Sequence, residues 1–131
     1  MEYVIDEHGT KRSYLKGYIL HSYDDMPAVI FANGSQYWYK DGNIHRENDM
    51  PAIIFANGDQ HWFRYNRLHR DNDLPSSVLT NGDRCWCKND KNHRDNDMPA
   101  VIRANGSAEW WINGEMIKKY DNYFTRVKRA N

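Results

Sequence analysis

The stretch HRENDMPAIIFANGDQHWFR, residues 45–64, contains every feature that decides the fold. A His-Arg pair leads into an Asp-x-Pro-Ala corner, a short β-branched run follows, and an Asn-Gly pair separates that run from an aromatic-rich one. The same pattern recurs on both sides at intervals of 24 residues. A fixed repeat of this kind specifies an architecture more strongly than an activity. The letters common to the copies are represented here by His45, Asp49, Pro51, Gly58 and Trp62.

Each copy contains a strong β-hairpin signal. In the copy before the quoted one, the β-prone segment 28–32 precedes an Asn-Gly pair, and both residues of that pair tolerate the positive φ angles of a type I′ turn. A two-residue loop would place Val29 opposite Trp38, with both side chains on one face of the sheet. Asp41-Gly42 then indicates a second reversal before the next corner.

These hairpins predict an all-β protein, an elongated antiparallel meander of hairpin repeats forming a single-layer ribbon. Residues 1–20 form a degenerate first repeat with Tyr14 at the tryptophan position, and residues 21–114 form four full repeats. After residue 114 the apolar residues fall at helical spacings. We therefore expect a C-terminal amphipathic α-helix over residues 115–128 that caps the last hairpin. The whole chain, residues 1–131, is then a single repeat domain.

Composition limits the classes of function. The chain has 18 basic and 18 acidic residues, so a general electrostatic grip on nucleic acid or on an anionic membrane is not expected. No apolar run reaches the ~20 residues that span a bilayer, and the N-terminus lacks the pattern of a secretory signal. The only cysteines are Cys85 and Cys87, which form no disulfide framework. A cytoplasmic location without a membrane partner is the prediction.

The run WYKDGNIHR, residues 38–46, resembles the membrane occupation and recognition nexus (MORN) repeat. That resemblance covers about residues 3–117 and implies hairpin units that serve as a binding scaffold for proteins or, in some members, lipids. The chain departs from the family after the histidine, where Arg46, Arg70 and Arg94 stand in place of the usual glycine. It looks more like a variant group found in bacteria and in viral or phage-like proteins. Lipid binding is therefore not carried over.

The recurring histidine and aspartate suggest metal or acid–base chemistry at first sight. However, the set occurs four times at one position of the repeat, whereas a catalytic centre needs one singular arrangement. We expect a structural ladder in which Arg46 pairs with Asp49 of its own repeat. Cys85 and Cys87 are interpreted as small apolar fillers, with a soft-metal site as the alternative. The sequence thus predicts no enzyme, no metal and no cofactor, and assigns His45, Asp49, Pro51 and Gly58 to the structure of the repeat.

Positions that differ between the copies are the better candidates for binding. Tyr and Arg are enriched at interaction hot spots, and they occur among the variable positions. The hypothesis is a protein-binding surface made of Tyr37, Tyr39, His61, Phe63, Tyr65, Arg67 and Trp111. The alternative is a single-stranded nucleic-acid binder, which would use a row of aromatic and basic residues. That row is Trp38, Lys40, Trp62, Arg64, Trp86 and Lys88.

The favoured interpretation is a non-enzymatic protein-binding repeat module. It would act as an adaptor or as a stoichiometric inhibitor of a larger protein, including a phage product aimed at host defence. Nucleic acid is the second class of partner. A ribbon with open edges and faces also allows pairing into a homodimer.

Overall fold

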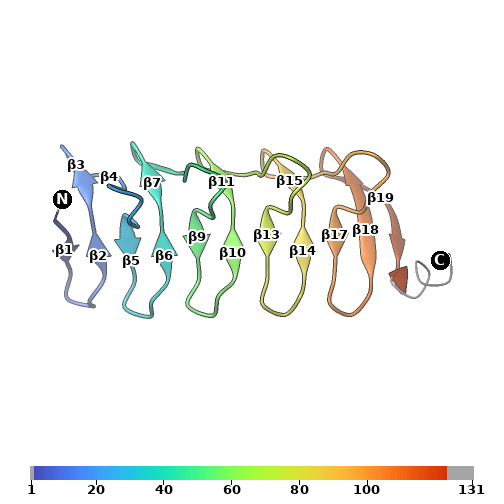
Figure 1. The fold of residues 1–131 in the computed structure, drawn as a ribbon, viewed down its shortest axis with the longest axis horizontal. Coiled ribbons are helices and arrows are strands. Elements are labelled where there is room, and N and C mark those ends of the chain that lie inside the picture. Colours follow the sequence, from blue (N-terminus) through green and yellow to red (C-terminus); the bar gives the residue numbers. More distant parts are fainter. Residues whose placement is uncertain (1, 124–131) are drawn as a thin grey trace. The chain divides into compact units, whose positions relative to one another are not determined.

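A computed structural model describes residues 2–123 of the 131-residue chain. The chain divides into two compact units, Met1–Arg67 and Leu68–Asn131, and each is described by itself. Both units are built from antiparallel β-hairpins that follow one another along the chain, which confirms the predicted all-β hairpin meander (Figure 1).

Six strands form the main sheet of the first unit. Their order in the sheet is β1-β2-β5-β6-β9-β10, and each strand pairs antiparallel with its neighbours. Two further hairpins, β3–β4 and β7–β8, form small sheets of their own. The strands are β1 (Val4–Ile5), β2 (Lys11–Arg12), β3 (Tyr14–Leu15), β4 (Ile19–Leu20), β5 (Val29–Ile30), β6 (Gln36–Tyr37), β7 (Tyr39–Lys40), β8 (Asn43–Ile44), β9 (Ile53–Ile54), β10 (Gln60–His61) and β11 (Phe63–Arg64), while β12 (Arg67–Leu68) lies where one unit passes into the other.

The second unit repeats this arrangement. Its main sheet has the order β13-β14-β17-β18-β19, again antiparallel throughout, and β15 pairs with β16 in a small sheet. The strands are β13 (Ser77–Val78), β14 (Arg84–Cys85), β15 (Cys87–Lys88), β16 (Lys91–Asn92), β17 (Val101–Ile102), β18 (Ala108–Ile112) and β19 (Glu115–Tyr120).

The Asn-Gly turn is not the predicted two-residue type I′ turn. The Phe31 N–H donates to the Ser35 carbonyl (2.9 Å) and the Gly34 N–H donates to the Phe31 carbonyl (2.9 Å). Only Gly34 of the loop has a positive φ, 96°. This is a three-residue loop with a glycine bulge, the next commonest hairpin connection. It shifts the register by one residue, so Val29 lies opposite Tyr37 rather than Trp38.

Type I′ geometry occurs at two other places in each repeat. One is the corner loop, the name used here for residues 22–27 and their equivalents at 46–51, 70–75 and 94–99. In it Asn48 and Asp49 have φ of 62° and 55°. The other is the second turn, between β7 and β8 and at equivalent hairpins, where Asp41 and Gly42 have φ of 49° and 83°. Asn, Asp and Gly tolerate positive φ best, which explains their recurrence at these sites.

Residues at the end of the first hairpin lie one position earlier in the sequence than the 24-residue interval predicts. The Ser13 N–H donates to the Ala28 carbonyl as the Trp38 N–H donates to the Ala52 carbonyl, both at 2.8 Å. Ser13, and not Tyr14, therefore occupies the tryptophan position, so the expectation for Tyr14 was wrong. The reason is one extra residue in the second turn, because β3 and β4 enclose three residues and β7 and β8 enclose two.

The predicted C-terminal helix is wrong over residues 115–120, which form strand β19. The segment pairs along the whole of β18, from Ile112 opposite Glu115 to Ala108 opposite Tyr120, with a bulge between Trp110 and Trp111. Free hydrogen-bonding groups on β18 favoured a strand over the helical periodicity. The part of the predicted helix at residues 124–128 lies outside the described residues.

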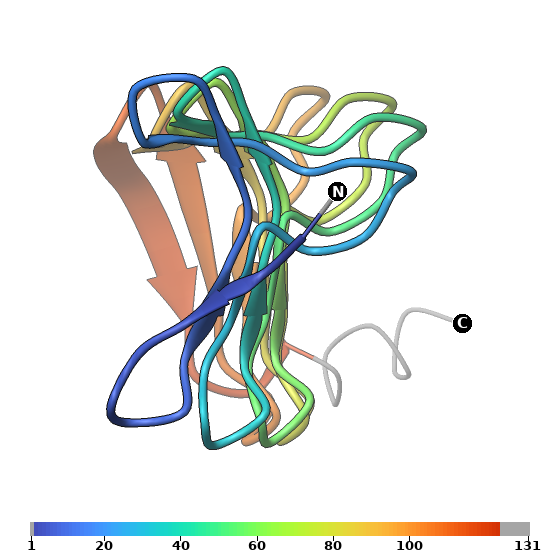
Figure 2. The same cartoon turned by 90° about the vertical axis from the view of Figure 1, so that its left-hand side faces the viewer.

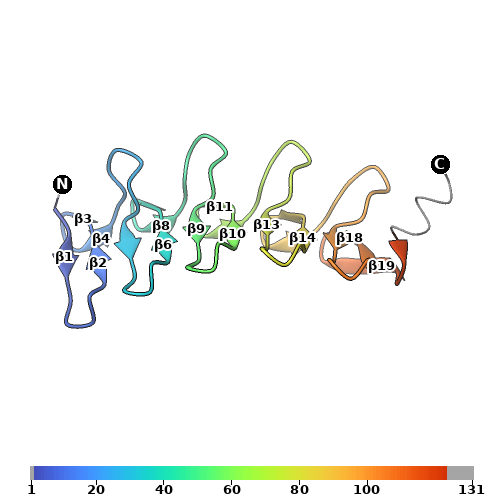
Figure 3. The ribbon, with the colours of Figure 1, turned by 60° about the horizontal axis from the view of Figure 1, so that its bottom comes forward.

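The two faces of each sheet differ. Cross-strand partners share a face, so Val29, Tyr37 and Arg12 lie on the side called the front face, and Ile30 and Gln36 lie on the back face. Corner loops project from one side of the sheet in the first unit (Figures 2 and 3). The core is thin, and its buried apolar residues are mainly alanines, β-branched residues and tryptophans. They include Ala28, Val29, Trp38, Ala52, Ile53, Trp62, Trp86, Ala100, Val101 and Trp110.

Candidate functional site

An arginine clamp holds one corner loop in each unit. In the first unit the Arg46 guanidinium lies 3.8 Å from the centre of the Trp38 ring and donates to both carboxylate oxygens of Asp25 (2.9 and 3.1 Å). It also donates to the Pro51 carbonyl (3.0 Å), while the Trp38 indole N–H donates to the Asp25 carbonyl (3.0 Å). The bond from Arg46 lowers the pKa of Asp25. One guanidinium therefore joins two successive repeats.

The second unit contains the same clamp. Arg94 lies 3.8 Å from the Trp86 ring centre and bonds Asp73 at 2.8 and 3.3 Å. The predicted pairing of an arginine with the aspartate of its own repeat was wrong for Arg46 and Arg94, because each bonds the aspartate 21 residues earlier. Within one repeat the chain turns back between the arginine and the aspartate at positive-φ residues such as Asn48 and Asp49, and the arginine bonds the preceding corner instead.

The clamp ends in β19. Lys118 stands where the next arginine would be and contacts Asp97 (3.4 Å) and the Trp110 ring (4.8 Å to its centre). Tyr120 and Tyr123 add ring contacts to Trp110 at 5.2 and 5.4 Å. The last tryptophan of the array is thus covered by the closing strand.

The clamp buries the tryptophans proposed for nucleic-acid stacking. Trp38, Trp62 and Trp86 are only 4%, 8% and 9% exposed. A base would need an open ring face, and Arg46 covers the Trp38 ring as Arg94 covers the Trp86 ring. Of the basic residues in the same hypothesis, Lys40 pairs with Glu47 (2.9 Å), while Arg64 and Lys88 are exposed. This geometry gives the tryptophan version of the hypothesis no support.

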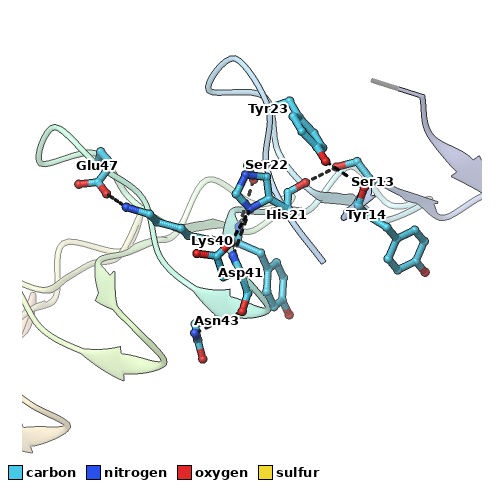
Figure 4. Close-up of polar contacts among 10 residues, drawn as sticks. Ser13, Tyr14, His21, Ser22, Tyr23, Lys40, Asp41, Asn43 and Glu47 are labelled. Atoms are coloured by element: carbon cyan, nitrogen blue, oxygen red, sulfur yellow. Dashed lines mark hydrogen bonds and ion pairs between the residues drawn. The ribbon is translucent and has the colours of Figure 1, made fainter. Parts of the chain in front are cut away.

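The repeated histidine is a connector between turns. His21 accepts the Asp41 backbone N–H at Nδ1 (3.1 Å), as Figure 4 shows, and His69 accepts the Asn89 N–H in the same way (3.2 Å). Because Nδ1 accepts, the proton of a neutral ring sits on Nε2. In His69 that nitrogen donates to Asp71 (2.7 Å). Each ring therefore links the start of a corner loop to the second turn that lies 20 residues further along the chain.

One junction in the first unit departs from this pattern. His45 accepts the Tyr65 N–H at Nδ1 (3.2 Å), and the Tyr65 ring stacks on the imidazole with centres 4.1 Å apart. Glu47 accepts from His45 Nε2 (3.0 Å) and from Lys40 (2.9 Å), and its bond to Lys40 raises the pKa of that lysine. The lysine–glutamate contact is also drawn in Figure 4. Here a tyrosine with φ of 45° replaces the usual Asp or Asn.

An aromatic row lies on the front face of the first unit. Phe31 contacts Tyr37 (5.1 Å between ring centres), Tyr37 contacts Phe55 (6.1 Å), and Phe55 contacts His61 (5.4 Å), all edge to face. Burial lowers the pKa of His61, which favours the neutral ring. Sequence reasoning named Tyr37 and His61 but missed Phe31 and Phe55, since the wrong register assigned β5 and β9 to the other face.

A second tier of aromatic side chains lies beside this row. Burial raises the pKa of Tyr39, Tyr37 adds to the rise and Arg12 opposes it. The repeat sets Phe63 at the position equivalent to Tyr39. The front aromatic surface is defined as Phe31, Tyr37, Tyr39, Phe55, His61 and Phe63. Phe55 is 36% exposed, and the other five are half-buried.

Ion pairs replace the aromatic pair in the first and last repeats. The position of Phe31 and Tyr37 is taken by Asp6 and Arg12 in the first repeat, whose side chains lie 2.7 Å apart. In the last repeat Arg103 and Glu109 pair at 3.0 Å. These ion pairs stand where the first unit carries its row of aromatic contacts.

The front face of the second unit carries smaller and more polar side chains than that of the first. Trp111 donates its indole N–H to Glu109 (2.9 Å). Burial acts to raise the pKa of Glu109, but the bonds from Trp111 and Arg103 outweigh it and leave the pKa lowered. Burial raises the pKa of both Cys85 and Cys87, so these thiols are protonated at neutral pH. Trp111 thus belongs to a different surface from the other proposed binding residues.

The remaining proposed binding residues, Tyr65 and Arg67, lie in and after a second turn and not on the front face. Both are exposed. Within residues 2–123 no group of three or more His, Cys, Asp or Glu side chains is arranged to hold a metal ion. In the same residues no helix has the length and apolar character needed to cross a membrane.

A scan against protein-family models, a search of curated proteins and a search of solved structures each found no match. The candidate site therefore rests on geometry alone.

Proposed function

We propose that the chain is a protein-binding repeat module and that the front aromatic surface of the first unit is its binding surface. The supporting observation is the continuous row of four rings from Phe31 to His61 with Phe55 exposed at its centre. Large aromatic side chains on a rigid scaffold contribute much of the free energy at protein interfaces. The resemblance to MORN repeats suggests the same kind of role.

The chemistry of this surface indicates the kind of partner. The ion pair beside it, Asp6 with Arg12, is neutralised internally, and burial lowers the pKa of His61, which favours the neutral ring. A polyanion would gain little on such a surface, while a neutral apolar patch of another protein would bury the rings. The proposed partner is therefore a protein with an uncharged apolar surface, and the role is that of an adaptor or stoichiometric inhibitor.

The test is affinity capture from the native host followed by titration of the captured protein against variants. Phe55→Ser removes the exposed centre of the surface, and Met50→Ser is the matched control on the corner loop, at 42% exposure. We expect at least about tenfold weaker binding for Phe55→Ser, which corresponds to the loss of one hot-spot side chain. Met50→Ser should bind within twofold of the wild type.

Two results would contradict the proposal. One is a captured protein that binds both variants and the wild type equally. The other is light scattering that shows a dimer of the wild type and a monomer of Phe55→Ser, because the surface would then be occupied by a second copy of this chain.

A further inference from the structure

The net charge of zero conceals a separation of charge within the first unit. The corner loops at 22–27 and 46–51 contain four acidic residues and one arginine, and that arginine is only 9% exposed as a side chain. The second turns and their flanks contain four basic residues and one acidic residue, Asp41. The four basic residues are Lys16, Lys40, Arg64 and Arg67.

The second turns lie side by side. The Gly42 N–H donates to the Leu20 carbonyl (2.8 Å), and the Asn66 N–H donates to the Ile44 carbonyl (2.9 Å). The Asn66 side chain also bonds that of Asn43 (2.7 Å). Three hairpin tips therefore form one ridge, with neighbouring repeats ~10 Å apart because each repeat adds two strands to the array.

Two tyrosines on this ridge occupy unfavourable backbone positions. Tyr18 has φ of 63° and is 84% exposed, and Tyr65 has φ of 45° and is 49% exposed. Bulky residues rarely adopt positive φ, and the equivalent positions in other repeats carry Asp, Asn or Gly. The Tyr65 ring stacks on His45 within the fold, whereas the Tyr18 ring is almost fully open to solvent and the backbone gives no reason for it. A residue that the backbone disfavours and solvent exposes indicates a binding role.

We propose that this ridge of Lys16, Tyr18, Lys40, Arg64, Tyr65 and Arg67 binds single-stranded nucleic acid. The basic side chains contact phosphates, Lys40 by exchanging its ion pair with Glu47 for a phosphate, and the Tyr18 ring and the face of Tyr65 turned away from His45 stack on bases. Basic residues flank each tyrosine, as in Lys16-Gly17-Tyr18 and Arg64-Tyr65, which is the alternation that backbone contact and stacking require together. An acidic protein segment would use the charges but leave the rings without a role. The proposal is independent of the protein-binding function of the front face.

The experiment measures fluorescence anisotropy of a labelled 15-nucleotide oligo-dT with the full chain in about 25 mM salt. We expect saturable binding that weakens as salt rises. The double variant Lys16→Gln/Arg67→Gln should bind about tenfold more weakly, and it should reduce the slope of log K against log salt by about 1.4, since each phosphate contact contributes about 0.7 on a single strand.

Tyr18→Asn separates stacking from folding. Asparagine suits positive φ, so the variant keeps the fold, and circular dichroism verifies this. Its affinity for oligo-dT should fall by at least about fivefold, the effect of losing one stacked base. The control Met26→Gln, on the corner loop and 47% exposed in the wild type, should bind like the wild type.

The proposal is overturned if the wild type gives no anisotropy change at low salt, or if Tyr18→Asn binds as the wild type does. It is also overturned if poly-glutamate of similar length displaces oligo-dT at equal concentration, because the ridge would then be a site for an acidic polypeptide.

Discussion

Replacing Arg46 should reveal how much the arginine clamp contributes to folding. In Arg46→Ala the buried Pro51 carbonyl loses its donor, which costs about 1–3 kcal/mol. The contact with the Trp38 ring, made by a guanidinium that is 9% exposed as a side chain, contributes about 1–2 kcal/mol. The ion pair adds at most about 1 kcal/mol because the Asp25 side chain is 60% exposed.

The free energy of unfolding of Arg46→Ala should therefore fall by about 3 kcal/mol, less than the sum because one guanidinium makes all three contacts. Arg46→Lys keeps the charge but loses the planar fork, and should fall by about 2 kcal/mol. The measurement is urea unfolding followed by tryptophan fluorescence. Arg67→Ala is the matched control at an exposed site and should change stability by no more than about 0.5 kcal/mol. If Arg46→Ala and Arg67→Ala unfold at the same urea concentration, the clamp does not join the repeats.

Three further predictions concern turns and histidines. Gly34→Ala should cost about 1–2 kcal/mol in urea unfolding, because φ of 96° strains any L side chain although nothing lies within 4 Å of the added carbon. His69→Leu should speed hydrogen exchange of the Asn89 amide, because that amide loses its acceptor. His69→Asn should keep the amide protected, because Oδ1 of asparagine replaces the accepting Nδ1. Equal exchange rates in the two variants would exclude the bond. Burial lowers the pKa of His61 below 6.5, so on acidification the unfolded chain binds a proton before the folded chain does. The free energy of unfolding should therefore fall as the pH drops through about 6.5, until the folded ring is also protonated. His61→Phe should lose this pH dependence, and a variant with the same pH profile as the wild type would refute it.

The sequence predicted the hairpin architecture because its strongest signals are local. Asn-Gly pairs, β-branched runs and positive-φ residues act over a few positions, and a 24-residue interval repeats them. Turn type was harder, since Asn33-Gly34 suits both a two-residue and a three-residue loop. One residue of difference in the loop reverses a face. That difference moved Phe31 and Phe55 away from the predicted binding surface.

The C-terminal strand and the arginine pairs could not be predicted from local pattern. Residues 115–120 have helical spacing, but the open edge of β18 supplies hydrogen bonds that a helix would leave unused. The partner of Arg46 depends on which corner lies beside it in space, and the repeat interval alone does not show whether that is the same corner or the preceding one. Departures from the repeat indicated the proposed binding ridge, because Tyr18 and Tyr65 replace residues that a positive φ would favour.

The most direct test of protein binding by the front face is hydroxyl-radical footprinting of the chain with and without its captured partner, read residue by residue by mass spectrometry. The account predicts that bound partner lowers oxidation of Tyr37, Tyr39 and Phe55 severalfold and leaves Met50 unchanged. Protection of Met50 with unchanged oxidation of the three aromatic side chains would place the partner on the corner loops and contradict the account.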